Sequence, residues 1–223
     1  MVKFVENELQ VIKQEINDMW VLVQQQFENA RKAVLSGDKQ LAEKVVAREK
    51  RVNSYELRID SDIEDFIALY NPVAIDLRFA LAMLNIANNL ERLGDYAEGI
   101  ARFVSRCETP DAAREIVSGT DLIKMYDMVL GMFSTVYKAL KEHDIEAAKS
   151  VFGRDDAIDE LNHRSLDALT SYATDHPQSV RLCLEVSAIF RKLERAGDHI
   201  NNLAEQTVYY IDAEVLKHKT NRE

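Results

Sequence analysis

The chain has 223 residues and a formal charge of −10, with 47% hydrophobic and 30% charged residues. This charge argues against sequence-independent binding of nucleic acid, which needs a basic surface. No apolar run approaches the ~20 residues that a membrane-spanning helix requires, and the start MVKFVENELQ lacks a signal-peptide pattern, so we expect a cytoplasmic protein that meets membranes only through its partners.

The first half of the chain reads as three long helices. Only three prolines and seven glycines occur in the whole sequence, which favours long helices with few turns and suggests no strands. Apolar residues recur three or four positions apart almost throughout, as in amphipathic helices. The pattern predicts helices over about 9–34 and 41–70 and a third from Pro72 to about 104, with breaks at SGD (36–38) and NP (71–72).

The second half repeats this scheme. CETPD (107–111) is the best candidate for a boundary between domains. Beyond it, the same apolar spacing predicts a fourth helix over about 116–140 that ends near EHD (142–144). A fifth helix is expected over about 145–172, and a sixth from HP (176–177) to about residue 216.

One phrase occurs twice, as LERLGD at 90–95 and as LERAGD at 193–198. The longer segments 77–95 and 180–198 align without a gap. A repeat of about a hundred residues is too long for a solenoid unit and suits two related domains. We therefore predict an all-α fold of two tandem, internally duplicated three-helix bundles with six long antiparallel helices, over residues 1–108 and 109–223.

The repeated phrase combines two features that disfavour a helix. Each copy holds a glutamate and an aspartate four residues apart, which places both on one helix face and destabilises an isolated helix by a few tenths of a kcal/mol. A mid-helix glycine costs about 1 kcal/mol relative to alanine. Such a combination calls for a compensating partner, or the glycine serves only to let two helices approach closely. The residues are Glu91, Gly94 and Asp95, and Glu194, Gly197 and Asp198.

The middle helix of each half carries further oxygen-bearing side chains. Glu49 and Asn53 lie one turn apart in the first half, and Asp155 and Asp159 in the second. Because the middle and last helices of an antiparallel bundle are neighbours, the two sets can converge. Four oxygen ligands in one place suit Mg²⁺, Mn²⁺, Zn²⁺ or iron.

Other partners for the acids remain open. Arginines of another helix could pair with them, or the acids could lie on a solvated face. We do not expect Arg92 and Arg195 to pair with the acids beside them, because i,i+1 side chains do not face each other. Glu160 and His163 form an ExxH pair, but a di-iron site needs two such pairs, so an exposed histidine is the simpler interpretation.

Several segments together resemble the PhoU family of phosphate-uptake regulators. Residues 42–60 and 71–102 are similar to the first half of a PhoU protein, and 154–169 and 191–211 to the second half. The resemblance covers nearly the whole chain. It implies tandem three-helix bundles, an often dimeric cytoplasmic protein, and carboxylate motifs that hold multinuclear metal clusters. It assigns Glu49, Asn53, Glu91 and Asp95 to a first cluster and Asp155, Asp159, Glu194 and Asp198 to a second.

Two departures from the family pattern concern these clusters. Glu49 stands where the family commonly has aspartate, and DLR at 76–78 has the counterpart SVR at 179–181, which lacks the acid. By resemblance, the protein is a non-enzymatic negative regulator of phosphate uptake and phosphate-starvation signalling. It would bind a sensor histidine kinase and the ATPase of the phosphate transporter, with iron, zinc, magnesium or manganese as metal. The alternatives are a carboxylate-bridged metalloenzyme, either a di-iron oxidase or a phosphoesterase, and a metal-free helical adaptor.

Overall fold

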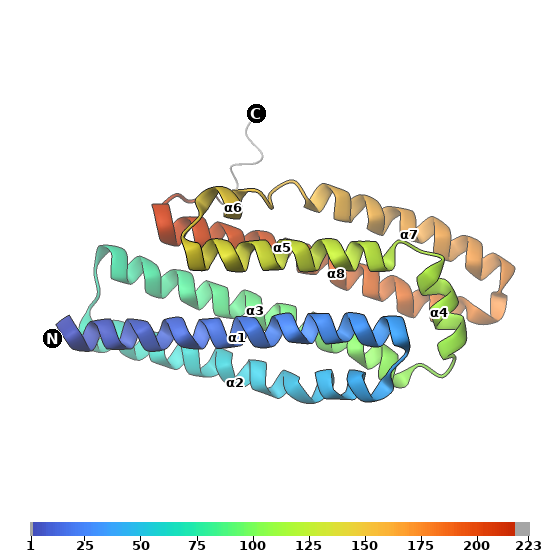
Figure 1. Cartoon of the computed structure of the whole chain (residues 1–223), viewed down its shortest axis with the longest axis horizontal. Coiled ribbons are helices and arrows are strands. Elements are labelled where there is room, and N and C mark those ends of the chain that lie inside the picture. Colours follow the sequence, from blue (N-terminus) through green and yellow to red (C-terminus); the bar gives the residue numbers. More distant parts are fainter. Residues whose placement is uncertain (1, 217–223) are drawn as a thin grey trace.

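A computed structural model of the protein describes residues 2–216, with side chains from residue 5 onward. Within this range the chain forms helices and no strand, and the long helices run side by side (Figure 1). The all-α expectation is confirmed. The elements are α1 (Val2–Ser36), α2 (Lys39–Tyr70), α3 (Ala74–Arg106), α4 (Pro110–Ser118), α5 (Leu122–Glu142), α6 (Ile145–Lys149), α7 (Asp155–Asp175), the 3₁₀ turn η1 (Pro177–Ser179) and α8 (Val180–Asp212).

Turns in the first half lie where the sequence places them. Gly37 adopts a φ of +69° after α1, a conformation that glycine reaches without strain. The Asp38 side chain then accepts a hydrogen bond from the backbone N–H of Leu41 at 3.0 Å and caps α2. At its other end α2 stops at Asn71, which is left-handed with a φ of 46° and precedes Pro72.

Helices of the second half are more broken than predicted. The fourth helix is divided into α4 and α5. The fifth is divided into α6 and α7 by residues 150–154, where Gly153 has a φ of +81°. A left-handed residue cannot continue an α-helix, so the single helix predicted over 145–172 is wrong, and Asp155 becomes the first residue of α7.

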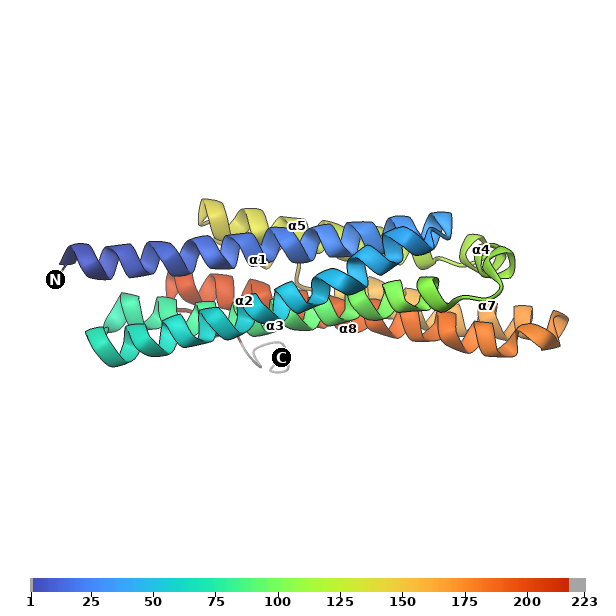
Figure 2. The same cartoon turned by 90° about the horizontal axis from the view of Figure 1, so that it is seen from below.

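The two halves share one core. α3 packs against α8 and α1 against α5, in addition to the contacts of α2 with α3 and of α7 with α8 (Figures 1 and 2). One continuous cluster of buried apolar side chains extends through both halves. Across the junction, the Trp20 ring stacks on Phe133 at 5.2 Å, and the buried Tyr126 hydroxyl donates to the carbonyl of Phe27 at 3.0 Å. In the part of the chain described, no helix is both long and apolar enough to cross a membrane.

Candidate metal centre

Glycine in each repeated phrase marks a close approach between the middle and last helices. A Cβ atom on Gly94 of α3 would lie 3.0 Å from Cγ1 of Val52 in α2. A Cβ atom on Gly197 of α8 would lie 3.2 Å from Cδ1 of Ile158 in α7. Both glycines are buried. The close-approach interpretation of these glycines is therefore confirmed, and the acids beside them lie at the same level of each helix pair.

The first acid cluster joins α2 to α3. The pKa of Glu91 is raised to about 7, first by burial and then by the negative charges of Asp95, Glu56 and Glu49. Glu56 itself has a raised pKa, to which burial contributes most and to which Asp95 also contributes. Carboxylates from α2 and α3 thus face one another, and their charges repel. A bound cation would relieve this repulsion.

Asn53 of α2 and Arg92 of α3 also belong to this cluster. The Asn53 Oδ1 atom is buried and has no hydrogen-bond donor. A buried oxygen without a donor is unfavourable by about 1–3 kcal/mol, and a cation would satisfy it. Arg92 lies with Nε 3.6 Å from Glu91 Oε2 and Nη1 3.7 Å from Asp95 Oδ2. The expectation that Arg92 would not reach its neighbours is wrong, because its long side chain bends back over both.

The second cluster joins α7 to α8. The pKa of Glu194 is raised, first by burial and then by Asp198 and Asp159. The pKa of Asp198 is also raised, first by loss of water around its carboxyl group and then by the charges of Asp159 and Asp155. As whole residues, Asp198 and Asp159 are nevertheless exposed. The four predicted residues of the second set are therefore connected, because Asp159 acts on both acids of α8 and Asp155 acts on Asp198.

Asn201 of α8 belongs to this second cluster and was not predicted. Its Nδ2 atom donates to Asp155 Oδ2 at 3.1 Å, while its Oδ1 atom is buried without a donor. Asn201 lies one turn after Asp198, so helical spacing could have found it. In the first cluster Glu56, an acid among the apolar positions of α2 that the sequence already shows, acts on Glu91 beside the four predicted residues.

Neither cluster is a ready-made coordination sphere. Among the residues that the structure describes, no three His, Cys, Asp or Glu side chains are arranged closely enough for a common ion. Binding of a common ion would therefore require the carboxylate side chains to rotate toward one another. The donor chemistry fits a hard or borderline cation, because every predicted ligand offers oxygen. Metal binding by these eight residues stays a prediction.

The two clusters lie on neighbouring helices of the shared core. Burial raises the pKa of Tyr96 in α3, and charges from both clusters act on its hydroxyl, namely Asp95 from the first and Asp198 from the second. Beside it, His199 Nδ1 of α8 lies 2.8 Å from Asn89 Oδ1 of α3. A polar contact between the two repeats therefore lies beside the clusters.

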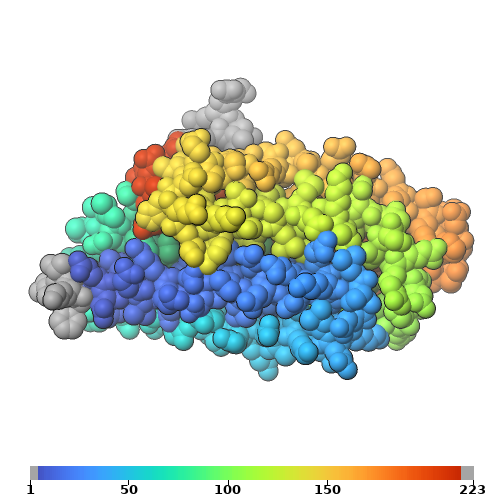
Figure 3. Space-filling model, in the orientation of Figure 1, coloured from blue at the N-terminus to red at the C-terminus, as the bar shows by residue number. Residues whose placement is uncertain are grey.

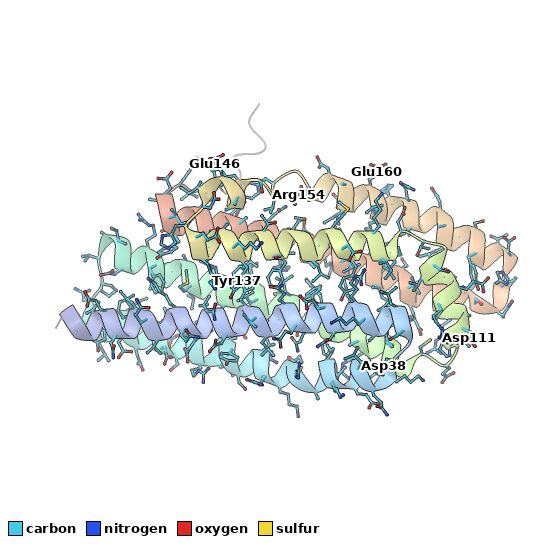
Figure 4. The ribbon with its side chains drawn as sticks, viewed as in Figure 1. Asp38, Asp111, Tyr137, Glu146, Arg154 and Glu160 are labelled. Carbon is cyan, nitrogen blue, oxygen red and sulfur yellow. The ribbon has the colours of Figure 1, made fainter. Side chains whose placement is uncertain are left out.

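The isolated ExxH pair lies apart from both clusters. Glu160 and His163 are exposed, and Figure 4 shows Glu160 on the outer side of α7. Neither residue is among the groups that act on the acids of the second cluster. The pair therefore adds no ligand to them.

Comparison with known proteins assigns the family. The model of the PhoU domain matches residues 16–104 and again residues 122–207. The chain belongs to the PhoU family. A relative from Aquifex aeolicus, named phosphate-specific transport system accessory protein PhoU homolog, is 31% identical over 213 residues, which are 95% of each chain. A relative of the same name from Burkholderia sp is 29% identical over 211 residues, 95% of this chain and 90% of the relative.

Solved PhoU structures have the same fold. PhoU from Pseudomonas aeruginosa superposes with a TM-score of 0.83 at 27% identity, covering 94% of this chain and 99% of that one. The phosphate transport system regulatory protein PhoU from Streptococcus pneumoniae gives the same TM-score and identity over 95% and 99%. These matches confirm the resemblance seen in the sequence and the tandem helical bundles of the fold.

Proposed function

We propose that the protein is a non-enzymatic regulator that dampens phosphate uptake and phosphate-starvation signalling. The observation that carries this proposal is the match over both repeats to relatives of nearly equal length that are named phosphate transport accessory proteins. In this proposal the protein works in the cytoplasm as a homodimer. It binds a sensor histidine kinase and the ATPase of the phosphate transporter through its long helix faces.

Metal binding is the chemistry that we propose for the two acid clusters. The cation would be iron, zinc, magnesium or manganese, alone or in a multinuclear cluster. The support is the facing of acids across each helix pair and the two buried amide oxygens without donors, on Asn53 and Asn201. A cation held there would fix α2 against α3 and α7 against α8, and would shift the population of the state that binds the partners.

Calorimetric titration of the metal-depleted protein with Mn²⁺ and Zn²⁺ tests the clusters. We expect saturable binding, weakened at least about tenfold at one cluster by Asp95→Asn and at the other by Asp198→Asn. Asp65→Asn in α2 and Asp167→Asn in α7 are matched controls, because both acids are exposed and neither belongs to a cluster. Wild-type protein that binds neither ion would favour the metal-free adaptor instead.

Regulation by metal requires a second measurement. The affinities of the metal-loaded and the metal-depleted protein for the kinase and for the ATPase should differ by about fivefold or more, as for typical coupled sites. Equal affinities in the two states would contradict a regulatory role of the metal. They would not contradict binding of the kinase and the ATPase.

A further inference from the structure

A hollow of about 390 Å³ lies where the two halves meet. Its walls come from α1 and α3 of the first half and from α5 and α8 of the second. Figure 4 shows Tyr137, one of the lining residues, between α5 and α1, and Figure 3 shows the α5–α6 segment in yellow lying against α1 in blue. This volume falls within the range of small-molecule sites, near its lower end.

Charge in the hollow is opposite to that of the protein. The chain has 38 acidic residues and a formal charge of −10, yet none of the described residues that line the hollow is an aspartate or glutamate. Its charged lining residues are Lys13 and Lys141, and His143 adds an imidazole. The adjacent Asp18 accepts hydrogen bonds from the side-chain amides of Gln14 and Asn17 at 2.8 and 3.4 Å. A pocket with this charge favours an anionic ligand.

Aromatic rings form much of the wall. The Lys13 Nζ atom lies 5.3 Å from the centre of the Phe79 ring, and the Lys141 Nζ atom lies 5.2 Å from the centre of the Tyr137 ring. Trp20 and Tyr210 also line the hollow. Each ammonium group is therefore held beside a ring face, so an anion bound by the lysines would have flat apolar surfaces next to it.

Trp20 supplies a donor that lacks an acceptor. The residue is fully buried, and its indole Nε1–H has no hydrogen-bond partner among the residues that the structure describes. Buried indole N–H groups usually find a partner. Trp20 is stacked on Phe133 and on Tyr137, at 5.2 and 5.5 Å, which fixes its ring. Trp20 therefore gives the wall of the hollow a fixed aromatic ring.

We propose that this hollow binds a mononucleotide, with its phosphate between Lys13 and Lys141 and its base against the aromatic wall. A phosphate suits the two ammonium groups, and base stacking on aromatic rings is favourable for any base. The small volume suits one nucleotide rather than two. Because both halves contribute walls, the ligand would hold α1 against α5. The hollow is built from residues outside the acid clusters, so the inference does not depend on metal binding.

Intrinsic fluorescence gives a direct test, because Trp20 is the only tryptophan of the chain. Titration of the full-length protein with AMP should change the emission in a saturable manner at one nucleotide per chain, and equilibrium dialysis should give the same affinity. Adenosine and inorganic phosphate should each bind at least about tenfold more weakly, because each makes only one kind of contact.

Lysine variants locate the site. Lys13→Gln and Lys141→Gln should each weaken AMP at least about tenfold, the range expected when a hydrogen bond to a charged group is lost. Lys32→Gln in α1 and Lys138→Gln in α5 remove the same charge from exposed positions on the same helices outside the hollow, and should leave the affinity unchanged. Absence of AMP binding in dialysis, equal binding of inorganic phosphate and AMP, or equal losses in the control variants would each overturn the proposal.

Discussion

Glu15 in α1 makes stability depend on pH. Its Oε1 atom pairs with Nε of Arg58 in α2 at 2.5 Å, while its Oε2 atom is buried without a donor. Burial, and after it the carboxyl of Asp62, raises the pKa of Glu15 from its ordinary 4.5 to about 7. Because the folded protein binds this proton more tightly, the resulting stabilisation is complete below the unfolded value of about 4.5 and is lost as pH rises through about 7.

Glu15→Gln should therefore flatten the pH dependence of stability. Urea unfolding measures the stability of the variant relative to wild type. This relative stability should increase between about pH 5.5 and about pH 8, because only wild type must then bury a charge. Glu43→Gln, at an exposed position of α2, is the matched control for loss of a carboxyl group. Parallel curves for Glu15→Gln and wild type would contradict the assignment.

Helical spacing predicted which acids share a face, but not all of their neighbours. Placing Glu91 with Asp95 needs only the 3.6-residue turn. The reach of Arg92 across both acids depends on the rotamer of a long side chain, and the contact of Asn201 with Asp155 depends on where α7 begins. Both are settled by tertiary packing, which a single sequence does not reveal.

Close packing of helix pairs can be tested with the glycines that permit it. Gly94→Ala places a methyl group 3.0 Å from the stiff, β-branched Val52, so overpacking should outweigh the helix-propensity gain and destabilise the protein by about 1 kcal/mol. Gly197→Ala meets only the flexible end of Ile158, at 3.2 Å, and should be nearly neutral. Urea unfolding at fixed pH measures both changes.

Gly131 in α5 provides the matched control. A Cβ atom there would meet nothing within 4 Å, so Gly131→Ala should stabilise by about 1 kcal/mol through helix propensity alone. Combining Gly94→Ala with Val52→Ala should cost less than the sum of the two single changes, because the second change removes the clash. Additive effects of the pair would mean that α2 and α3 do not meet at Gly94.

Lengths of the helices were predictable where the apolar period and the turn residues agree, as at Gly37 and Pro72. The break between α6 and α7 was not, because apolar spacing continues across it through Val151 and Ile158, which are both buried. The regular helix ends at Lys149, and the left-handed Gly153 follows shortly before α7 begins at Asp155. A lone glycine in an apolar pattern is compatible with a helix or with a break, and the packing of the second half selects the break.

Burial across the junction determines how the whole molecule should unfold. The division into two domains, over 1–108 and 109–223, stays a prediction from the sequence. The shared apolar core and the buried hydrogen bond from Tyr126 to Phe27 mean that separating the halves would expose a large apolar surface. We therefore expect the metal-free protein to unfold in one cooperative step.

Two probes in different halves can test this cooperativity. Trp20 emission reports on the packing of α1 against α5 at the junction. Alkylation of Cys183, which is free and 5% exposed, reports on the second half in a Cys107→Ala background. Both signals should change at the same urea concentration and with the same slope, because a single transition exposes both sites. Tyr126→Phe should shift the two curves together by about 1 kcal/mol, the net value of one hydrogen bond. A Trp20 transition at clearly lower urea than the exposure of Cys183 would show that the halves separate before they unfold.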